Sequence, residues 1–315
     1  MSISHLIIPD TQVKPGVPLQ HLTWAGDYLV DKRPDVVVHL GDHWDMPSLS
    51  SYDRGMQAAE GRTYADDVAA GNMGMQMLLA PLRAYQKTKE GKNYKPRLVF
   101  LMGNHCERIK RHINANPHLD GKIGYKDLDL SDWEVHDFLE VVEINGIRYS
   151  HYFAQMNTGK AHSAQAGLRL QKLGFSFTMG HQQGKQSAER FLNDGTGQRA
   201  MIAGSFYLHQ EDYKGHQGNH HWNGVILKHE VKDGNYDLLE VSTAYLERRY
   251  KSKHPKASHA PVVYKAANMA AIQSIGCPAC GSTKTCGNGV RATKQSGSYQ
   301  RRICQQCGTN FKRPV

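Results

Sequence analysis

Long apolar runs are absent from this sequence. The one apolar run near its start, Leu6-Ile7-Ile8, is far shorter than a secretory signal or a membrane span requires. Of the 315 residues 39% are apolar, enough for one large domain, or for a large domain and a small one. We therefore expect a soluble, cytoplasmic protein without a membrane partner. Nothing in the sequence indicates its oligomeric state.

Cysteine is scarce over most of the chain. Five of the six cysteines lie between residues 277 and 307. A reducing cytoplasm disfavours disulfides, which leaves metal coordination as their expected role. Two Cys-x-x-Cys pairs separated by 23 residues have the spacing of a tetrahedral zinc site, formed by Cys277, Cys280, Cys304 and Cys307. We predict one structural Zn²⁺ there, because so short a segment with few large apolar side chains needs such support to fold.

Acidic residues are absent after Glu247. Residues 248–315 carry 13 of the 39 Lys and Arg, whereas all 29 Asp and Glu precede them. An uncompensated basic block is typical of a segment that binds a polyanion, and a basic tail that only aids solubility is the alternative. The basic residues expected to contact nucleic acid are Arg291, Lys294, Arg301, Arg302, Lys312 and Arg313.

Three short apolar runs predict strands that are buried on both faces. These runs are 5–8, 36–40 and 97–102, and polar residues follow each of them at once. Helical spacing of apolar residues predicts helices over 19–29 and 64–85, and Pro81 should kink the second helix or end it early. Strands that alternate with helices indicate an α/β fold with functional loops at the carboxyl ends of the strands.

The second half of the chain is richer in strands. Asn145-Gly146 is a strong two-residue turn signal between strands expected over 138–144 and 147–152. Further strands are expected over 175–179, 199–207, 225–231 and 238–241. The predicted domains are a large domain over 1–247, a basic linker over 248–275 and a cysteine-rich module over 276–315.

Polar residues that could bind metal follow five of the predicted strands. Carboxylate, amide and imidazole groups suit divalent cations, and the glycines let the backbone turn sharply away from a strand. One such loop would mean little, but five in one order favour a metal site. The loops are Asp10-Thr-Gln12, Gly41-Asp42-His-Trp-Asp45, Gly103-Asn104-His105, Ser150-His151 and Gly180-His181-Gln-Gln183.

This order of motifs resembles the calcineurin-like metallophosphoesterase superfamily over residues 1 to about 245. The resemblance implies a two-sheet β-sandwich flanked by helices, with two metals at the edge of the sheets. It implies that Asp42 bridges the metals, that Asn104, His151 and His181 complete the second metal site, and that Asp10 binds the first metal. It also implies that His105 is not a ligand but contacts the phosphate and protonates the leaving group.

Two residues depart from the family pattern, and both fall on the first metal. Gln12 and Gln183 stand where the family has histidines. An amide oxygen in place of an imidazole makes this site harder and weaker, which favours Mn²⁺ or Mg²⁺. Two alternatives are that the site fills only together with substrate, and that the first metal is lost. Neighbouring groups are interpreted as accessory: Asp45 as a hydrogen-bond partner behind Asp42, Cys106 as a packing residue, and His216, His220 and His221 as a loop near the substrate.

The cysteine-rich module, over 276–313, resembles the zinc ribbons at the DNA-binding ends of insertion-sequence transposases. A ribbon used for protein contacts is the alternative, since a fold alone does not define a function. The leading hypothesis is a metal-dependent nuclease whose tail binds DNA or RNA. Two other hypotheses remain: a phosphatase or phosphodiesterase acting on small nucleotides or phosphoproteins, and a non-catalytic protein that binds nucleic acid.

Overall fold

The computed structural model describes residues 3–53, 55–56, 59–211, 214–254, 285–293, 297–304 and 310–314. The chain divides into two compact units, residues 1–264 and 265–315. The boundary expected at residue 247 lies inside helix α6 (Thr243–Tyr250). Tyr250 is buried and donates a hydrogen bond to Asp31, so the fold of the first unit continues past that boundary.

The first unit is a mixed α/β structure that contains two mixed sheets. In the larger sheet β1 to β4 run parallel, and β10 and β11 are antiparallel additions at one edge. Its strands, in spatial order, are β11 (Asn235–Ser242), β10 (Gly224–Lys232), β1 (His5–Ile8), β2 (Val36–His39), β3 (Arg97–Leu101) and β4 (Glu134–His136).

The smaller sheet contains the hairpin that the sequence predicts. Asn145 and Gly146 have positive φ angles of 52° and 81°, the conformation that a two-residue hairpin turn needs, and they join β5 to β6. Strands β6, β7 and β9 are parallel to one another. The strands, in spatial order, are β5 (Val142–Ile144), β6 (Ile147–Ser150), β7 (Phe177–Met179), β9 (Gly197–Ile202) and β8 (Gln186–Phe191).

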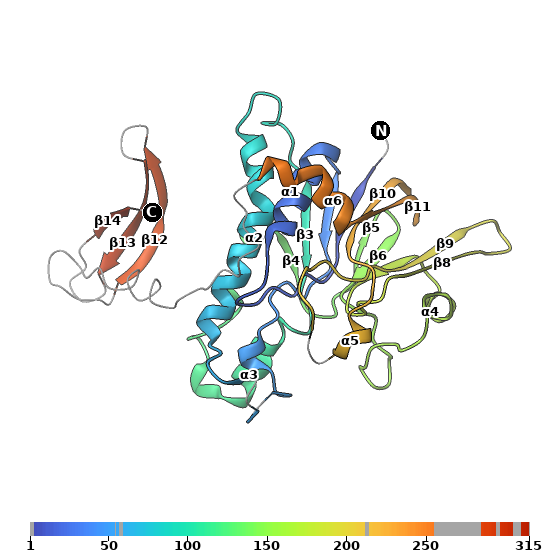
Figure 1. Cartoon of the computed structure of the whole chain (residues 1–315), viewed down its shortest axis with the longest axis horizontal. Coiled ribbons are helices and arrows are strands. Elements are labelled where there is room, and N and C mark those ends of the chain that lie inside the picture. The colour runs from blue at the N-terminus through green and yellow to red at the C-terminus, as the bar shows by residue number, and fades with distance from the viewer. Residues whose placement is uncertain are drawn as a thin grey trace. The chain divides into compact units, whose positions relative to one another are not determined.

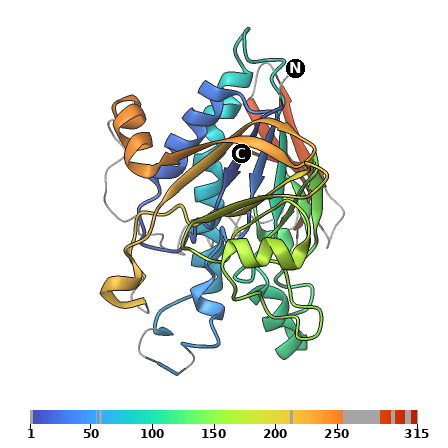
Figure 2. The same cartoon turned by 90° about the vertical axis from the view of Figure 1, so that its right-hand side faces the viewer.

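The two sheets pack face to face between layers of helices (Figure 1 and Figure 2). Because side chains alternate along a strand, Ile7 faces Tyr149 and Met201 of the other sheet, whereas Leu6 belongs to the cluster beneath the helices. Helices α1 (Gln20–Lys32) and α2 (Tyr64–Gln86) cover the larger sheet. Helix α4 (Ala166–Leu173) packs on the outer face of the smaller sheet. The order of layers is therefore helices, sheet, sheet, helix.

Pro81 does not end α2, which continues to Gln86, so the expectation of an early end is wrong. The proline ring lies against Gly26 of α1, where an added Cβ would come within 2.9 Å of the ring. Since Gly26 has no side chain, the two helices approach closely, and this packing offsets the backbone hydrogen bond that proline cannot make. In the described part of the chain, no helix combines the length and apolar character of a membrane span.

The described residues of the second unit form an antiparallel sheet of β12 (Thr285–Thr293), β13 (Gly297–Cys304) and β14 (Asn310–Pro314). Five of the six predicted nucleic-acid contacts lie on these strands: Arg291 on β12, Arg301 and Arg302 on β13, and Lys312 and Arg313 on β14. Arg301 and Lys312 are register partners. Lys294 and three of the proposed zinc ligands, Cys277, Cys280 and Cys307, lie outside the described residues. The zinc site therefore stays a prediction.

Candidate metal centre

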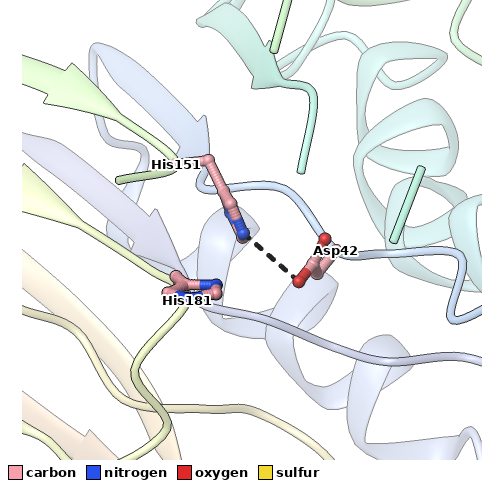
Figure 3. A group of neighbouring side chains, drawn as sticks. All are labelled: Asp42, His151 and His181. Atoms are coloured by element: carbon pink, nitrogen blue, oxygen red, sulfur yellow. Dashed lines mark ion pairs between the residues drawn. The ribbon is translucent and has the colours of Figure 1, made fainter. Parts of the chain in front are cut away.

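The predicted ligands follow strands that run in the same direction in each sheet. Asp10 and Asp42 lie past the ends of β1 and β2, and Asn104 lies past β3. His151 and His181 follow β6 and β7 of the smaller sheet. Figure 3 shows the side chains of Asp42, His151 and His181 pointing toward one another, and their ligand atoms lie within 4.8 Å of each other. The sequence-predicted residues of the second metal site thus meet across the two sheets.

The acceptor atoms around His151 favour a positive charge at its Nε2 atom. Its Nδ1 lies 2.7 Å from the carbonyl oxygen of Leu40, an atom that can only accept a hydrogen bond. In the neutral ring Nε2 therefore carries a lone pair, and it faces Asn104 Oδ1 at 2.9 Å and Asp42 Oδ2 at 3.2 Å. Three acceptor atoms converge with no proton between them. A cation, either a proton on Nε2 or a metal ion, must neutralise this arrangement.

The pKa values of the two histidines in the cluster agree with a cation at this position. Burial alone would lower the pKa of His151, but the carboxylate of Asp42 outweighs it and raises the pKa to about 9. His181 is different, because burial and the charge of His151 lower its pKa to about 4. Its ring is therefore neutral near pH 7 and can donate a lone pair to a metal ion. Its Nδ1 lies 2.7 Å from Asn104 Oδ1. Two imidazoles, a carboxylate and an amide oxygen form a donor set that suits a divalent transition metal.

Asp10 is fully buried, and its two carboxylate oxygens differ. Oδ1 accepts a hydrogen bond from the backbone N–H of His181 at 3.2 Å, whereas Oδ2 has no partner among the described residues. Burial, with a contribution from the charge of Asp42, raises the pKa of Asp10 to about 7. A buried carboxylate oxygen without a partner fits a position next to a cation.

The two glutamines of the predicted first metal site form hydrogen bonds with other residues. Gln183 Oε1 accepts a hydrogen bond from the hydroxyl of Tyr207 at 2.8 Å. Gln12 is buried, and its backbone N–H donates to the carbonyl oxygen of Asp42 at 2.9 Å. Within the described ranges, Asp42, His151 and His181 form the one cluster of histidine, cysteine and carboxylate residues with metal-site spacing. All three residues of this cluster belong to the predicted second metal site.

Two glycines of the motifs are required by close contacts with the carboxylates. A Cβ at Gly103 would lie 2.0 Å from Asp42 Oδ1 and 2.3 Å from the backbone nitrogen of Asp42. A Cβ at Gly180 would lie 2.4 Å from Asp10 Oδ1. Any larger residue would therefore displace the carboxylates, which explains why glycine precedes both Asn104 and His181.

His105 lies beside the cluster and is held by two aspartates. Its backbone N–H donates to Asp42 Oδ1 at 2.8 Å, and its Nδ1 lies 2.5 Å from Asp45 Oδ1. The other ring nitrogen, Nε2, lies 3.9 Å from Asp42 Oδ2. Burial lowers the pKa of His105, but Asp42 and Asp45 outweigh it, and the net pKa is raised. Asp45 is therefore a hydrogen-bond partner, as expected, and the side chain that it holds is His105.

Several residues around Asp45 were not predicted from the sequence. Lys14 Nζ lies 3.3 Å from Asp45 Oδ2 and 2.7 Å from the buried carboxylate of Glu211. Arg108 donates to the backbone carbonyl of Asp45 at 2.8 Å. No motif marks these residues, because they come together only through the fold. Cys106 was interpreted as a packing residue, and it is fully buried in the core beneath the helices.

A scan against protein-family models finds no match to this chain, and a search of curated proteins finds none either. The geometry of the cluster and the order of the motifs are what indicate a metal site.

Proposed function

We propose that this chain is a metal-dependent phosphoester hydrolase of the calcineurin-like metallophosphoesterase superfamily, and that it acts as a nuclease. The observation that carries the proposal is the convergence of acceptor atoms from His151, Asn104 and Asp42 at 2.9 and 3.2 Å, with His181 beside them. With two imidazoles, a carboxylate and an amide oxygen, the set suits a divalent transition metal. The helix–sheet–sheet–helix layers and the positions of the motifs at the sheet edge support the same proposal.

A divalent cation held by these residues would polarise a phosphate oxygen and lower the pKa of water near it. The chain itself supplies the proton for the leaving group. Asp45 fixes Nδ1 of His105, so that Nε2 faces the same space as the Asp42 carboxylate. When the P–O bond to the leaving oxygen breaks, His105 donates its Nε2 proton to that oxygen. General acid catalysis of this kind contributes about 10²–10⁴ in rate.

The basic block after Glu247 supports a polynucleotide as the substrate. It carries 13 Lys and Arg and no acidic residue, and several of the basic residues lie on β12, β13 and β14. We propose that the second unit is a zinc ribbon that binds the phosphate backbone. Binding through phosphates releases counterions, so the affinity should fall steeply as salt increases.

An activity screen tests the function. The intact chain is assayed with Mn²⁺, Mg²⁺ or Zn²⁺ on a chromogenic phosphodiester, single-stranded DNA, duplex DNA and RNA. We expect hydrolysis of the chromogenic diester and of at least one polynucleotide, and its loss in Asp42→Asn. Asp53→Asn is the matched control, because Asp53 forms a partly exposed ion pair with Arg62 and is not one of the predicted site residues. Equal activity in the Asp42 variant and the control would refute the proposal.

A further inference from the structure

Two aromatic side chains, Phe138 and Tyr152, lie against the histidines of the metal cluster. The ring centre of Tyr152 is 4.8 Å from that of His181 and 5.9 Å from that of His151. Phe138 packs edge-to-face on Tyr152, with the ring centres 5.5 Å apart and the ring planes at 80°. The proposed metal and proton chemistry uses neither ring. A ring this close to the metal cluster would lie next to any phosphodiester bound there.

The backbone of Tyr152 is held firmly, although its side chain is only partly buried. Its neighbours in the sequence, His151 and Phe153, are 1% and 5% exposed. The hydroxyl of Ser150 donates a hydrogen bond to the backbone carbonyl oxygen of Tyr152 at 3.0 Å. The side chain between these two buried residues remains partly open to solvent. A fixed and partly exposed ring suits stacking with a nucleobase, since every base has a flat face.

Arg111 of helix α3 (Arg108–Ala115) adds a positive charge beside these rings. The central carbon of its guanidinium group lies 5.8 Å from the ring centre of Phe138, within the range of a cation–π contact. The preceding residue, Lys110, forms an ion pair with Asp137 at 2.8 Å. Arg111 itself is exposed, and no ion pair joins it to a carboxylate in the described part of the chain. Its guanidinium group is therefore available to an anionic ligand such as a phosphate.

From these contacts we propose that Tyr152, Phe138 and Arg111 form a nucleotide-binding subsite beside the metal cluster, and that its ligand is single-stranded nucleic acid. Tyr152 stacks on one base, and Arg111 binds the oxygens of a neighbouring phosphate. Phe138 fixes these two side chains relative to each other, because it contacts both. A base inside a duplex is covered on both faces by its neighbours, so the subsite selects an unpaired base. This inference rests on the proposed nuclease function and specifies its substrate.

Two chromogenic esters with the same leaving group test the contact with the base. Thymidine 5′-(4-nitrophenyl phosphate) carries a base, whereas methyl 4-nitrophenyl phosphate does not, and the ratio of their kcat/KM values cancels a general loss of activity. Tyr152→Leu should lower this ratio by about 5- to 150-fold, the range for loss of one base stacked on an aromatic ring. Tyr152→Phe keeps the ring and should keep the ratio. The matched control Tyr245→Leu, at an exposed tyrosine of α6, should keep it too.

A fluorescent trinucleotide gives a second readout, which does not depend on activity. A single-stranded trinucleotide with 2-aminopurine at its centre is titrated with the full chain and Mn²⁺, in a His105→Ala background that slows the proposed cleavage. Stacking quenches the fluorescence of 2-aminopurine, so Tyr152→Leu should reduce the quenching. Arg111→Met should make the slope of log affinity against log salt shallower by about 0.7, as one phosphate contact to a single strand is lost. The matched control Arg33→Met, at the exposed end of α1, should keep the slope.

The outcomes separate this inference from the proposed function. An unchanged ester ratio or unchanged quenching in Tyr152→Leu would overturn the subsite while leaving the hydrolase intact. An unchanged salt slope in Arg111→Met would overturn the role of the arginine. Faster cleavage of duplex DNA than of the same strand alone would overturn the assignment of a single-stranded ligand. Quenching that depends on Tyr152, in a chain that hydrolyses neither ester, would support the subsite and refute the hydrolase.

Discussion

Replacing Asp45 with Asn should slow only those reactions that need a proton at the leaving oxygen. Asp45 Oδ1 lies 2.5 Å from Nδ1 of His105, and both side chains are largely buried. Asparagine keeps the shape but removes the charge that orients and protonates the imidazole. A charged hydrogen bond of this kind contributes about 1.5–3 kcal/mol, which corresponds to a rate change of about 10- to 150-fold.

The assay compares two phosphodiesters that differ only in the leaving group. For an alkyl or nucleoside leaving group we expect kcat of Asp45→Asn to fall by about 10- to 150-fold. For 4-nitrophenolate, which leaves without a proton, we expect a change below about threefold. Because the aspartate acts through His105, the double variant with His105→Ala should be no slower than His105→Ala alone. Equal losses on both substrates, or additive effects, would refute the assigned role of Asp45.

Three further predictions test the packing, the core and the tail. Gly103→Ala should weaken Mn²⁺ affinity by about 10- to 100-fold, because its Cβ would displace Asp42. The control variant Gly167→Ala on α4 should bind Mn²⁺ as the unaltered chain does. Equal affinities in the two variants would contradict the close contact. Lys228 is fully buried between the sheets, and burial lowers its pKa well below the usual value. The unfolded chain therefore binds a proton that the folded chain does not, so the free energy of unfolding should rise with pH up to about 10. Lys228→Met should flatten that rise and add at least about 1 kcal/mol in denaturant titrations, unlike the exposed Lys232→Met; an unchanged slope would contradict it. Removal of residues 255–315, which retains the buried Tyr250, should abolish salt-dependent DNA binding but leave hydrolysis of the chromogenic diester unchanged. Equal loss of DNA binding and of diester hydrolysis would contradict a tail that binds nucleic acid.

Much of the strand framework could be predicted from the sequence because buried parallel strands are continuous apolar runs. The run at 36–40 became β2, and the Asn145-Gly146 turn joined β5 to β6. Strand β8 was missed, because it lies at the edge of its sheet and reads Gln-Ser-Ala-Glu-Arg-Phe, with little apolar signal. Pro81 did not end α2, because the packing of α2 on Gly26 is a tertiary effect that a local rule for proline cannot include.

Some residues of the candidate site could likewise be predicted from the sequence, and others could not. Motifs after strands identified Asp42, Asn104, His151 and His181, because parallel strand ends converge in space. The partner of Asp45 could not be predicted, since it depends on how the loop after β2 packs against His105.

The most direct test of the central claim is reconstitution of the apoprotein with one divalent metal at a time, followed by hydrolysis of a chromogenic phosphodiester. The account predicts no hydrolysis in the presence of chelator, recovery with Mn²⁺, and no recovery in His151→Ala, which removes a nitrogen donor of the cluster. Hydrolysis that persists in chelator, or that returns equally in His151→Ala, would contradict a metal centre at these residues.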